Sequence, residues 1–153
     1  MNASLPTSDL RDPDFAARIR DSFQRQGFMR HIGAEIEELT PGRCVIGVPF
    51  RTEVSQQHGF FHGGIIGTLA DNAGAYAAFT LIGAEQSMLT VEYNVNLLKP
   101  GAGERLRAEG EVLRAGRSLS VSRVSVFALS GEERTLCAAA LVTMMTLAGR
   151  GDR

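Results

Sequence analysis

The amino-acid sequence predicts an α+β fold in which an antiparallel sheet of five or six strands curves around a single long helix. Two observations support this architecture. The run from Gly63 to Ile82 is almost entirely small or apolar, and a helix that is apolar on nearly all sides has to be wrapped by other elements. Before and after this run, strand-like segments are separated by turn residues. The expected order is therefore a hairpin, the helix and a four-stranded meander.

The composition is typical of a soluble, cytoplasmic, single-domain protein. The 153 residues are enough to bury a sizeable core, and 44% of them are hydrophobic and 22% charged. The net charge of −1 gives no general attraction to nucleic acid or to an anionic membrane. Cys44 and Cys137 have neither metal-binding nor redox spacing, so we expect two reduced thiols in the core. The first residues show no signal-peptide pattern.

Residues 32–148 are expected to form the main domain. Residues 1–31 are expected to precede it as a flexible start, over residues 1–11, followed by an amphipathic helix that lies on the surface of the domain. Asp12 is suited to cap this helix and Pro13 to occupy its first position. Apolar residues at intervals of four predict one buried stripe, which consists of Phe15, Ile19 and Phe23. Gly27 is suited to end the helix.

The strands are predicted from turn residues and from alternation. A hairpin is expected on either side of Pro41-Gly42, and after the long helix residues 88–98 alternate as a half-buried strand does. One face carries Leu89, Val91, Tyr93, Val95 and Leu97, and the other carries Met88, Thr90, Glu92, Asn94, Asn96 and Leu98. Three further strands follow, with turns at residues 115–117 and 130–133. Because such a sheet leaves strand edges exposed, we expect edges to pair between two subunits.

Asp71 is the only charged residue in the apolar run, and a buried carboxylate is costly unless it is paired, protonated or used. Three interpretations are open. Asp71 could cap a second, shorter helix after a turn, it could be a structural acid satisfied by neighbouring hydroxyls, or it could be a catalytic or ligand-binding carboxylate. A stripe of small residues beside it would let another backbone or a ligand come close, and it consists of Gly63, Gly67, Ala70, Gly74 and Ala78.

The start of the long helix, at Gly63 and Gly64, is a second candidate for chemistry. Backbone N–H groups there lack partners within the helix, and glycine leaves them accessible, so they could polarise a carbonyl or hold an oxyanion. Phosphate binding is the competing use, but no Walker or GxGxxG pattern is present. Gly63 and Asp71 would lie about 12 Å apart along the helix. If both are catalytic, the simplest assembly is a two-fold dimer in which each site takes one residue from each chain.

The histidines of the preceding loop do not predict a metal site. His58 and His62 have a spacing of four, but the glycine-rich loop would not bring their side chains together as a helix would. His62 is better suited to orient the loop through hydrogen bonds. A Ser-His-Asp triad is possible from composition, but the sequence lacks the GxSxG motif that accompanies such a triad in many hydrolases.

The motif Q-x-H-G-x-x-H-G-G-x-x-x-x-L-x-D, from Gln56 to Asp71, is followed by T-V-E-Y-N-V-N-L-L-K-P and later by A-G-R-S. Together these motifs resemble the hotdog-fold acyl-CoA thioesterases of the phenylacetyl-CoA (PaaI-like) group. The resemblance covers residues 32–147 and follows the same order of elements. It implies a hotdog fold, an acyl-CoA thioesterase activity, a homodimer or homotetramer, and no cofactor apart from the coenzyme A of the substrate.

The resemblance also implies roles for individual residues. The N–H of Gly63 would polarise the thioester carbonyl, and the partner subunit's Asp71 would act as a general base on water or as a nucleophile. Gln56 would help to hold the carbonyl or the water, and Thr90 would position the water. The turn formed by Gly116, Arg117 and Ser118 resembles a segment that meets coenzyme A, and Lys99 is a nearby basic residue.

The acyl group and the reaction stay open at this point. Glutamine at position 56 is similar to the hydroxybenzoyl-CoA branch of the family, whereas aspartate at position 71 is similar to the phenylacetyl branch. The resemblance is therefore compatible with arylacetyl, benzoyl or short-to-medium acyl groups. The alternatives are a non-catalytic acyl-CoA sensor of the same fold and a hotdog enoyl-CoA hydratase or dehydratase, which would use a histidine and an acid.

Overall fold

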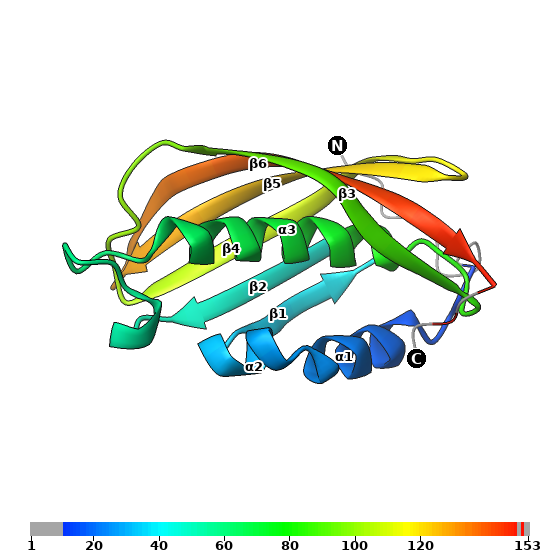
Figure 1. The fold of residues 1–153 in the computed structure, drawn as a ribbon, viewed down its shortest axis with the longest axis horizontal. Helices are drawn as coiled ribbons and strands as arrows, with labels where there is room; N and C mark the ends of the chain where they lie inside the picture. Colours follow the sequence, from blue (N-terminus) through cyan, green and yellow to red (C-terminus); the bar gives the residue numbers. More distant parts are fainter. Residues whose placement is uncertain (1–10, 150, 152–153) are drawn as a thin grey trace.

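The computed structural model describes residues 11–149 and residue 151 (Figure 1). Its helices are α1 (Phe15–Arg25), α2 (Gly27–Ile32) and α3 (Gly63–Phe79), with a 3-10 turn at Thr52–Val54. Its strands are β1 (Glu35–Thr40), β2 (Arg43–Pro49), β3 (Gln86–Leu97), β4 (Arg105–Ala115), β5 (Leu119–Ser130) and β6 (Glu133–Ala148). The flexible start expected at residues 1–11 lies outside the described residues, apart from Arg11. Within the described part, no helix is both long and apolar enough to cross a membrane.

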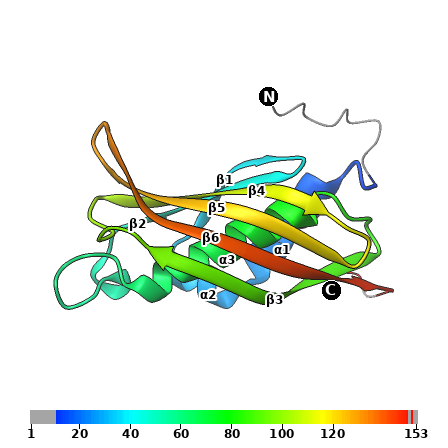
Figure 2. The same ribbon diagram turned by 90° about the horizontal axis from the view of Figure 1, so that it is seen from above.

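Six antiparallel strands form one sheet that curves around α3, as predicted (Figures 1 and 2). Their order is β1-β2-β4-β5-β6-β3, so the expected four-stranded meander is wrong. β3 pairs with β6, at the far edge of the sheet, and β4 pairs with β2. The physical reason is that α3 carries the chain across the concave face from β2 to the opposite edge, and the chain returns to the middle only after β3.

The helix α3 lies very close to the sheet because small residues face each other. A Cβ atom built on Gly110 of β4 would come within 2.2 Å of the carbonyl oxygen of Ala73, and one built on Gly74 would come within 2.8 Å of Val142. The Ser122 hydroxyl donates a 2.9 Å hydrogen bond to the carbonyl of Gly74. The small-residue stripe of α3 therefore admits the backbone of the sheet, which is one of its two predicted uses.

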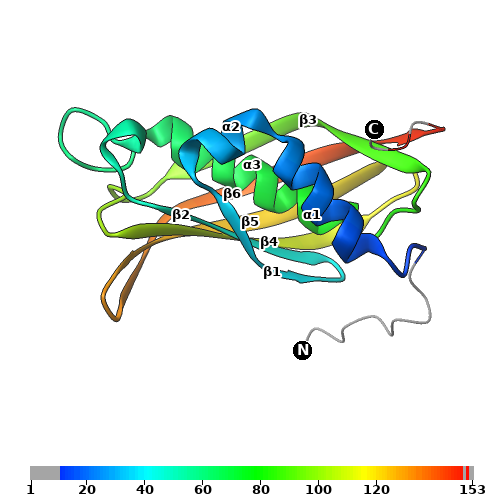
Figure 3. The ribbon, with the colours of Figure 1, turned by 90° about the horizontal axis from the view of Figure 1, so that it is seen from below.

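The predicted apolar stripe of the N-terminal helix is confirmed, because Phe15, Ile19 and Phe23 are buried in the same core as α3. Figure 3 shows α1 and α2 alongside α3. The predicted ends of this helix are wrong. α1 begins at Phe15 with Asp14 as its N-cap, two residues later than predicted. The Asp12 carboxylate still accepts hydrogen bonds from the Asp14 N–H, as a capping side chain does, and from the Arg18 side chain. The proposed division of the chain at residue 32 stays a prediction.

Gly27 does not end the N-terminal helical segment but begins the short helix α2. The interruption lies one residue earlier, where Gln26 is extended with φ −72° and ψ 104°. α2 then ends at Gly33, which has a φ of +71° and thus a left-handed conformation that glycine adopts easily. The helical segment is therefore bent at Gln26.

The predicted hairpin is confirmed, with β1 and β2 joined at Pro41-Gly42 and Gly42 at a φ of +75°. The expectation for the two cysteines is also confirmed, since Cys44 and Cys137 are free and buried. Burial raises the pKa of Cys44 to about 12 and that of Cys137 to about 11, so both thiols stay protonated at neutral pH.

The alternation of β3 is interrupted by a β-bulge between Thr90 and Glu92. Thr90 lies opposite Met144 and Tyr93 lies opposite Val142, both buried residues of the inner face, whereas Glu92 lies opposite Thr143. The expectation that Thr90 shares a face with Glu92 is therefore wrong. A bulge adds one residue to one strand, so every side chain beyond it changes face. As an edge strand, β3 also leaves large apolar side chains exposed, including Leu89, Val91, Tyr93 and Leu97.

Candidate active site

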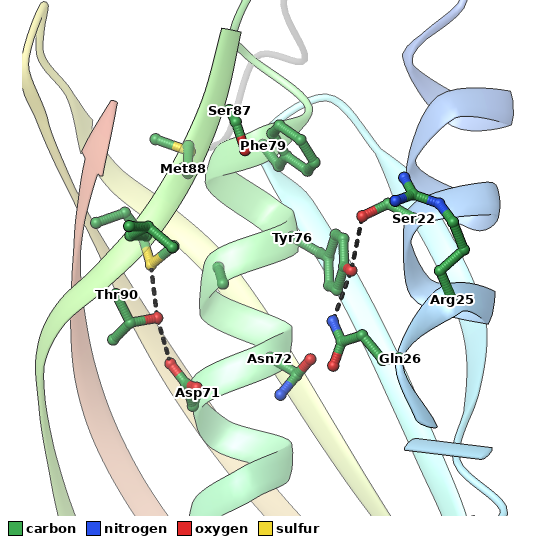
Figure 4. Close-up of a pocket in the computed structure, with 13 residues that line it drawn as sticks. Ser22, Arg25, Gln26, Asp71, Asn72, Tyr76, Phe79, Ser87, Met88 and Thr90 are labelled. Carbon is green, nitrogen blue, oxygen red and sulfur yellow. Dashed lines mark hydrogen bonds between the residues drawn. The ribbon is translucent and has the colours of Figure 1, made fainter. Parts of the chain in front are cut away.

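Asp71 lies near the middle of α3 and points toward β3 (Figure 4). Because α3 continues unbroken to Phe79, the interpretation of Asp71 as the cap of a second helix is wrong. The Thr90 hydroxyl donates a 2.7 Å hydrogen bond to Oδ1 of Asp71, and it also lies 3.2 Å from the sulfur of Met144. Burial raises the pKa of Asp71, and the hydrogen bond from Thr90 offsets part of that rise. The bulge that follows Thr90 lets both Thr90 and Tyr93 face the helix side of β3.

A cavity of about 380 Å³ lies in front of Asp71, between β3 on one side and α1 on the other (Figure 4). Its lining comprises Ser22, Arg25, Gln26, Asp71, Asn72, Ala75, Tyr76, Phe79, Ser87, Met88, Leu89, Thr90 and Met144. Of these residues, only Asp71 and Thr90 are site residues that the sequence predicted. We refer to this space as the Asp71 cavity.

The sequence reasoning missed the part of the Asp71 cavity that α1 and Tyr76 supply. A signal for it was present, because Ser22 and Gln26 continue the apolar stripe of Ile19 and Phe23 at helical spacing. Polar residues inside a buried stripe indicate a polar contact or a ligand. Here Gln26 Nε2 donates a 2.7 Å hydrogen bond to the Tyr76 hydroxyl, and Ser22 Oγ lies 3.1 Å from the same oxygen.

A second cavity, of about 450 Å³, lies at the start of α3. Gln56, Gly63 and Lys99 all line it, so the structure brings these three predicted residues together. Among the residues that the structure describes, none accepts a hydrogen bond from the Gly63 N–H. The side-chain oxygen of Gln56 accepts a hydrogen bond from the His58 N–H, which leaves the NH₂ group of its amide to donate to a ligand. We refer to this space as the Gly63 cavity.

His62 is the N-cap of α3. Its Nδ1 accepts a 2.9 Å hydrogen bond from the Gly64 N–H, and its backbone carbonyl accepts one from Ile65. His62 therefore accepts the hydrogen bond of the Gly64 N–H, whereas the N–H of Gly63 is left to bind a ligand. Neither His58 nor His62 lines the Asp71 cavity. Over residues 11–149 and 151, no three metal-binding side chains gather in a way that could hold a metal ion.

The predicted coenzyme A turn joins β4 to β5. The Gly116 N–H donates to the carbonyl of Leu119, the carbonyl of Ser118 accepts from the Thr146 N–H, and Arg117 is exposed. Leu119 pairs with Met145, which in turn pairs with Leu89 at the start of β3. The turn thus lies at the end of the sheet where β3 begins, whereas Lys99 follows the other end of β3. Within one chain the predicted residues form two separate groups.

Residues 58–135, from the loop before α3 to the start of β6, match the model of the Thioesterase superfamily. The chain belongs to the thioesterase superfamily. Its six-stranded sheet around a central helix is the hotdog fold of that family, as the resemblance implied, and hydrolysis of a thioester is the chemistry for which the family is named.

Several known proteins resemble the chain over most of its length. A thioesterase family protein from Silicibacter pomeroyi is 42% identical, with a TM-score of 0.86 over 88% of this chain and 99% of that protein. The 1,4-dihydroxy-2-naphthoyl-CoA hydrolase of Listeria monocytogenes is 27% identical over 72% of this chain and 89% of its own length. The PaaI protein of the E. coli phenylacetic acid degradation operon has a TM-score of 0.80 at 19% identity, over 92% of this chain and 98% of that one, which shows a common fold.

Proposed function

We propose that this member of the thioesterase superfamily hydrolyses acyl-CoA thioesters to a free acid and coenzyme A. The observation that carries the proposal is the position of Asp71. Its half-buried carboxylate has a raised pKa, accepts a hydrogen bond from Thr90 and lines a cavity large enough for an acyl group. A perturbed carboxylate in such a cavity is suited to act on water or on the substrate itself.

Hydrolysis of a thioester requires few catalytic groups, because the carbonyl carbon is electrophilic and the thiolate is a good leaving group. As a general base, Asp71 takes a proton from water while the water oxygen bonds to the carbonyl carbon. As a nucleophile, its carboxylate forms an anhydride with the acyl group and water then cleaves that anhydride. In both routes the C–S bond breaks and coenzyme A leaves as the thiolate, which then takes up a proton. Thr90 holds the carboxylate toward the cavity.

Gly63 and Gln56 would polarise the carbonyl. The open N–H of Gly63 at the start of α3 and the amide NH₂ of Gln56 line the same cavity, and both can donate to an oxygen that becomes negative in the transition state. Gly63 and Asp71 of one chain are separated by about 12 Å along the helix, which is too far for both to act on one carbonyl. The proposed site therefore contains Gly63 and Gln56 of one subunit and the partner subunit's Asp71.

The exposed edge of β3 supports a two-fold homodimer. Thr90, beside Asp71, lies toward the start of β3, and Leu97, beside Gly63, lies at its end. If two β3 strands paired antiparallel across a two-fold axis, Thr90 of each chain would approach Leu97 of the other. The Asp71 cavity of one subunit would then face the Gly63 cavity of its partner. The same pairing would cover the apolar side chains that the edge strand exposes.

Coenzyme A would bind across the two subunits. Its phosphates would stay at the surface, where Lys99 of one subunit and the partner subunit's Arg117 are exposed. The backbone of Gly116 and Ser118 would shape the turn that presents Arg117. The named relatives, a dihydroxynaphthoyl-CoA hydrolase and a protein of a phenylacetic acid degradation operon, support an acyl-CoA with an aromatic acyl group.

The test is release of thiol from a panel of acyl-CoAs, with Asp71→Asn and Gln56→Ala beside the wild type. We expect wild-type hydrolysis that falls by about 100-fold or more in Asp71→Asn. Glu53→Gln, which alters an exposed carboxylate outside both cavities, is the matched control. Tight binding of acyl-CoA without turnover would identify a sensor instead, and hydration of an enoyl-CoA without thiol release would identify a hydratase.

A further inference from the structure

The far end of the Asp71 cavity has no part in the chemistry proposed above. Asp71, Ala75 and Phe79 all line the cavity and follow one another at intervals of four residues, which places them along one face of α3. We call these three residues the α3 row. Phe79 ends α3 eight residues beyond Asp71, or about 12 Å along the helix axis, and Figure 4 shows the two side chains well apart. The cavity therefore extends along α3 from the carboxylate to an aromatic ring.

The β3 side of the α3 row is apolar. Met88 and Met144 line the cavity there, and Ala75 contributes only a methyl group between the two ends of the row. A hydrocarbon chain that lies along these side chains leaves water for an apolar surface, which favours binding. The small side chain of Ala75 leaves room for such a chain to pass along the helix.

The polar side chains on the other side of the cavity are engaged with one another. Gln26 Nε2 donates a 2.7 Å hydrogen bond to the Tyr76 hydroxyl, and Ser22 Oγ lies 3.1 Å from the same oxygen. Asn72 Nδ2 donates a 3.1 Å hydrogen bond to the carbonyl of Thr68. An apolar group that lies on the β3 side leaves these bonds intact.

Phe79 is held at the end of the α3 row by a residue of the N-terminal helix. The Arg18 guanidinium lies 4.6 Å from the centroid of the Phe79 ring, and Arg18 does not line the cavity, so it contacts the ring from outside. Arg18 Nε forms a 2.7 Å ion pair with the buried Asp12 carboxylate, and another guanidinium nitrogen donates to the carbonyl of Ile82 at 3.4 Å. With these two anchors, the guanidinium supports the ring against displacement away from the cavity.

We propose that Phe79 sets the greatest length of acyl group that the enzyme accepts, and that Arg18 is the positioning residue that holds Phe79 in place. An acyl group whose thioester lies at Asp71 extends past Ala75 until it meets the Phe79 ring. Carbon–carbon bonds are about 1.5 Å long and zigzag along the chain, so the α3 row accommodates an extended acyl group of about eight carbon atoms.

The inference rests on the proposed function, in which Asp71 marks the thioester end of the cavity. It also extends that function to a part of the chain that the superfamily model does not match. Arg18 and its partner Asp12 precede the matched residues 58–135. The N-terminal helix thus takes part in the selection of the substrate without contact to the reacting atoms.

The test measures kcat/KM for unbranched acyl-CoAs from butanoyl to hexadecanoyl, and for a second series in which a phenyl ring ends chains of increasing length. We expect wild-type values to fall beyond the octanoyl length. Phe79→Leu should raise the ratio of kcat/KM for dodecanoyl-CoA to that for octanoyl-CoA by about tenfold, because it removes the ring that ends the row. Ala75→Leu should lower the ratio for octanoyl-CoA to butanoyl-CoA by about tenfold, because it adds bulk halfway along the row.

Arg18→Met tests the positioning role, because it keeps an unbranched apolar side chain but removes the charge. We expect it to raise the dodecanoyl-to-octanoyl ratio in the same direction as Phe79→Leu, and to add no further change in the double variant. Arg20→Met is the matched control on the exposed side of α1, where Arg20 donates to the carbonyl of Ile36, and it should keep the wild-type ratio. A merely structural role of Arg18 would lower Tm and kcat/KM for all lengths by one factor, and the ratio would stay unchanged.

The outcomes separate this inference from the proposed function. Hydrolysis without an upper limit of length, or with a limit that Phe79→Leu and Ala75→Leu leave unchanged, would overturn the inference and leave the thioesterase proposal intact. If no acyl-CoA is hydrolysed, the thioesterase proposal fails, and calorimetric binding of non-hydrolysable thioether analogues of the same series decides the inference. An affinity that falls beyond the octanoyl length in the wild type, but only at greater length in Phe79→Leu, would support it. Identical affinity profiles for the two proteins would overturn it.

Discussion

The hydroxyl of Thr90 donates a 2.7 Å hydrogen bond to Oδ1 of Asp71, and this bond connects the edge strand β3 to the middle of α3. Thr90 pairs with the buried Met144, and the β-bulge that follows it lets Thr90 and Tyr93 both face the inside of the sheet. The contact gives the helix carboxylate one hydroxyl partner while its other oxygen stays available to the cavity. Both the pH dependence of activity and the stability of the protein should depend on this pair.

The first prediction concerns the acid limb of the pH–rate profile. If Asp71 acts in its ionised form, kcat/KM rises with pH through its pKa, which burial places above the ordinary carboxyl value. Because the hydrogen bond from Thr90 lowers that pKa, Thr90→Val should move the limb to higher pH, and Thr90→Ser should restore it. The measurement is kcat/KM against pH for the three proteins. A limb that stays in place in Thr90→Val would contradict the prediction.

The second prediction concerns stability. A carboxyl whose folded-state pKa is raised contributes stability that is present below the unfolded-state pKa and lost as the pH rises through the folded-state pKa. The uncharged Asp71→Asn avoids this loss and can still accept the Thr90 hydrogen bond. At pH 7 we expect its Tm to exceed that of the wild type by about 1–3 °C. The difference should disappear in acid, below the ordinary carboxyl pKa, in thermal scans across pH.

The third prediction tests the site shared between two subunits through Gly63. Gly63→Pro removes the N–H, and proline suits the first position of a helix. The preceding residue, His62, already has a ψ of 137°, which a residue before proline prefers. We expect Gly63→Pro to fold and to lose activity by about 100-fold, whereas Gly63→Ala, which keeps the N–H, should retain more of it.

Mixing the two defective chains extends this test. A heterodimer of Asp71→Asn and Gly63→Pro contains one intact site and one site with both defects. After random exchange of equal amounts, about a quarter of all sites are intact, so we expect about a quarter of wild-type activity. Exchange is verified by mass spectrometry of a tagged chain. Verified heterodimers without recovered activity would exclude a site shared in this way.

The fourth prediction concerns the close contact between helix and sheet. Gly110→Ala should lower the free energy of unfolding by about 1–3 kcal/mol or more, since the added Cβ would meet backbone atoms of Ala73 and Gly74. Gly27→Ala is the matched control, because its Cβ would meet only the end of the Arg30 side chain at 3.8 Å. Denaturant unfolding of both variants checks the contrast. Equal effects would contradict the packing argument.

Much of the architecture could be predicted from local patterns. The nearly uninterrupted apolar run indicates a surrounded helix, and Pro41-Gly42 indicates the hairpin turn. The apolar stripe Phe15, Ile19 and Phe23 indicates a helix that packs on the core. Each of these signals depends on the period of a helix or strand, or on the backbone preferences of glycine and proline, and both act over a few residues.

The tertiary structure alone decided which strands pair and which side chains meet. β3 lies beside β6 because α3 carries the chain to the far edge of the sheet, and alternation within a strand contains no information about its partner. The bulge between Thr90 and Glu92 shifts the pairing of β3 with β6 by one residue, and the composition of the strand does not reveal where it lies. Gln26 meets Tyr76 from 50 residues away along the chain. The sequence by itself therefore determined the elements, the candidate carboxylate and the candidate N–H group. Their arrangement into two cavities at opposite ends of α3 followed from long-range packing, which no local pattern contains.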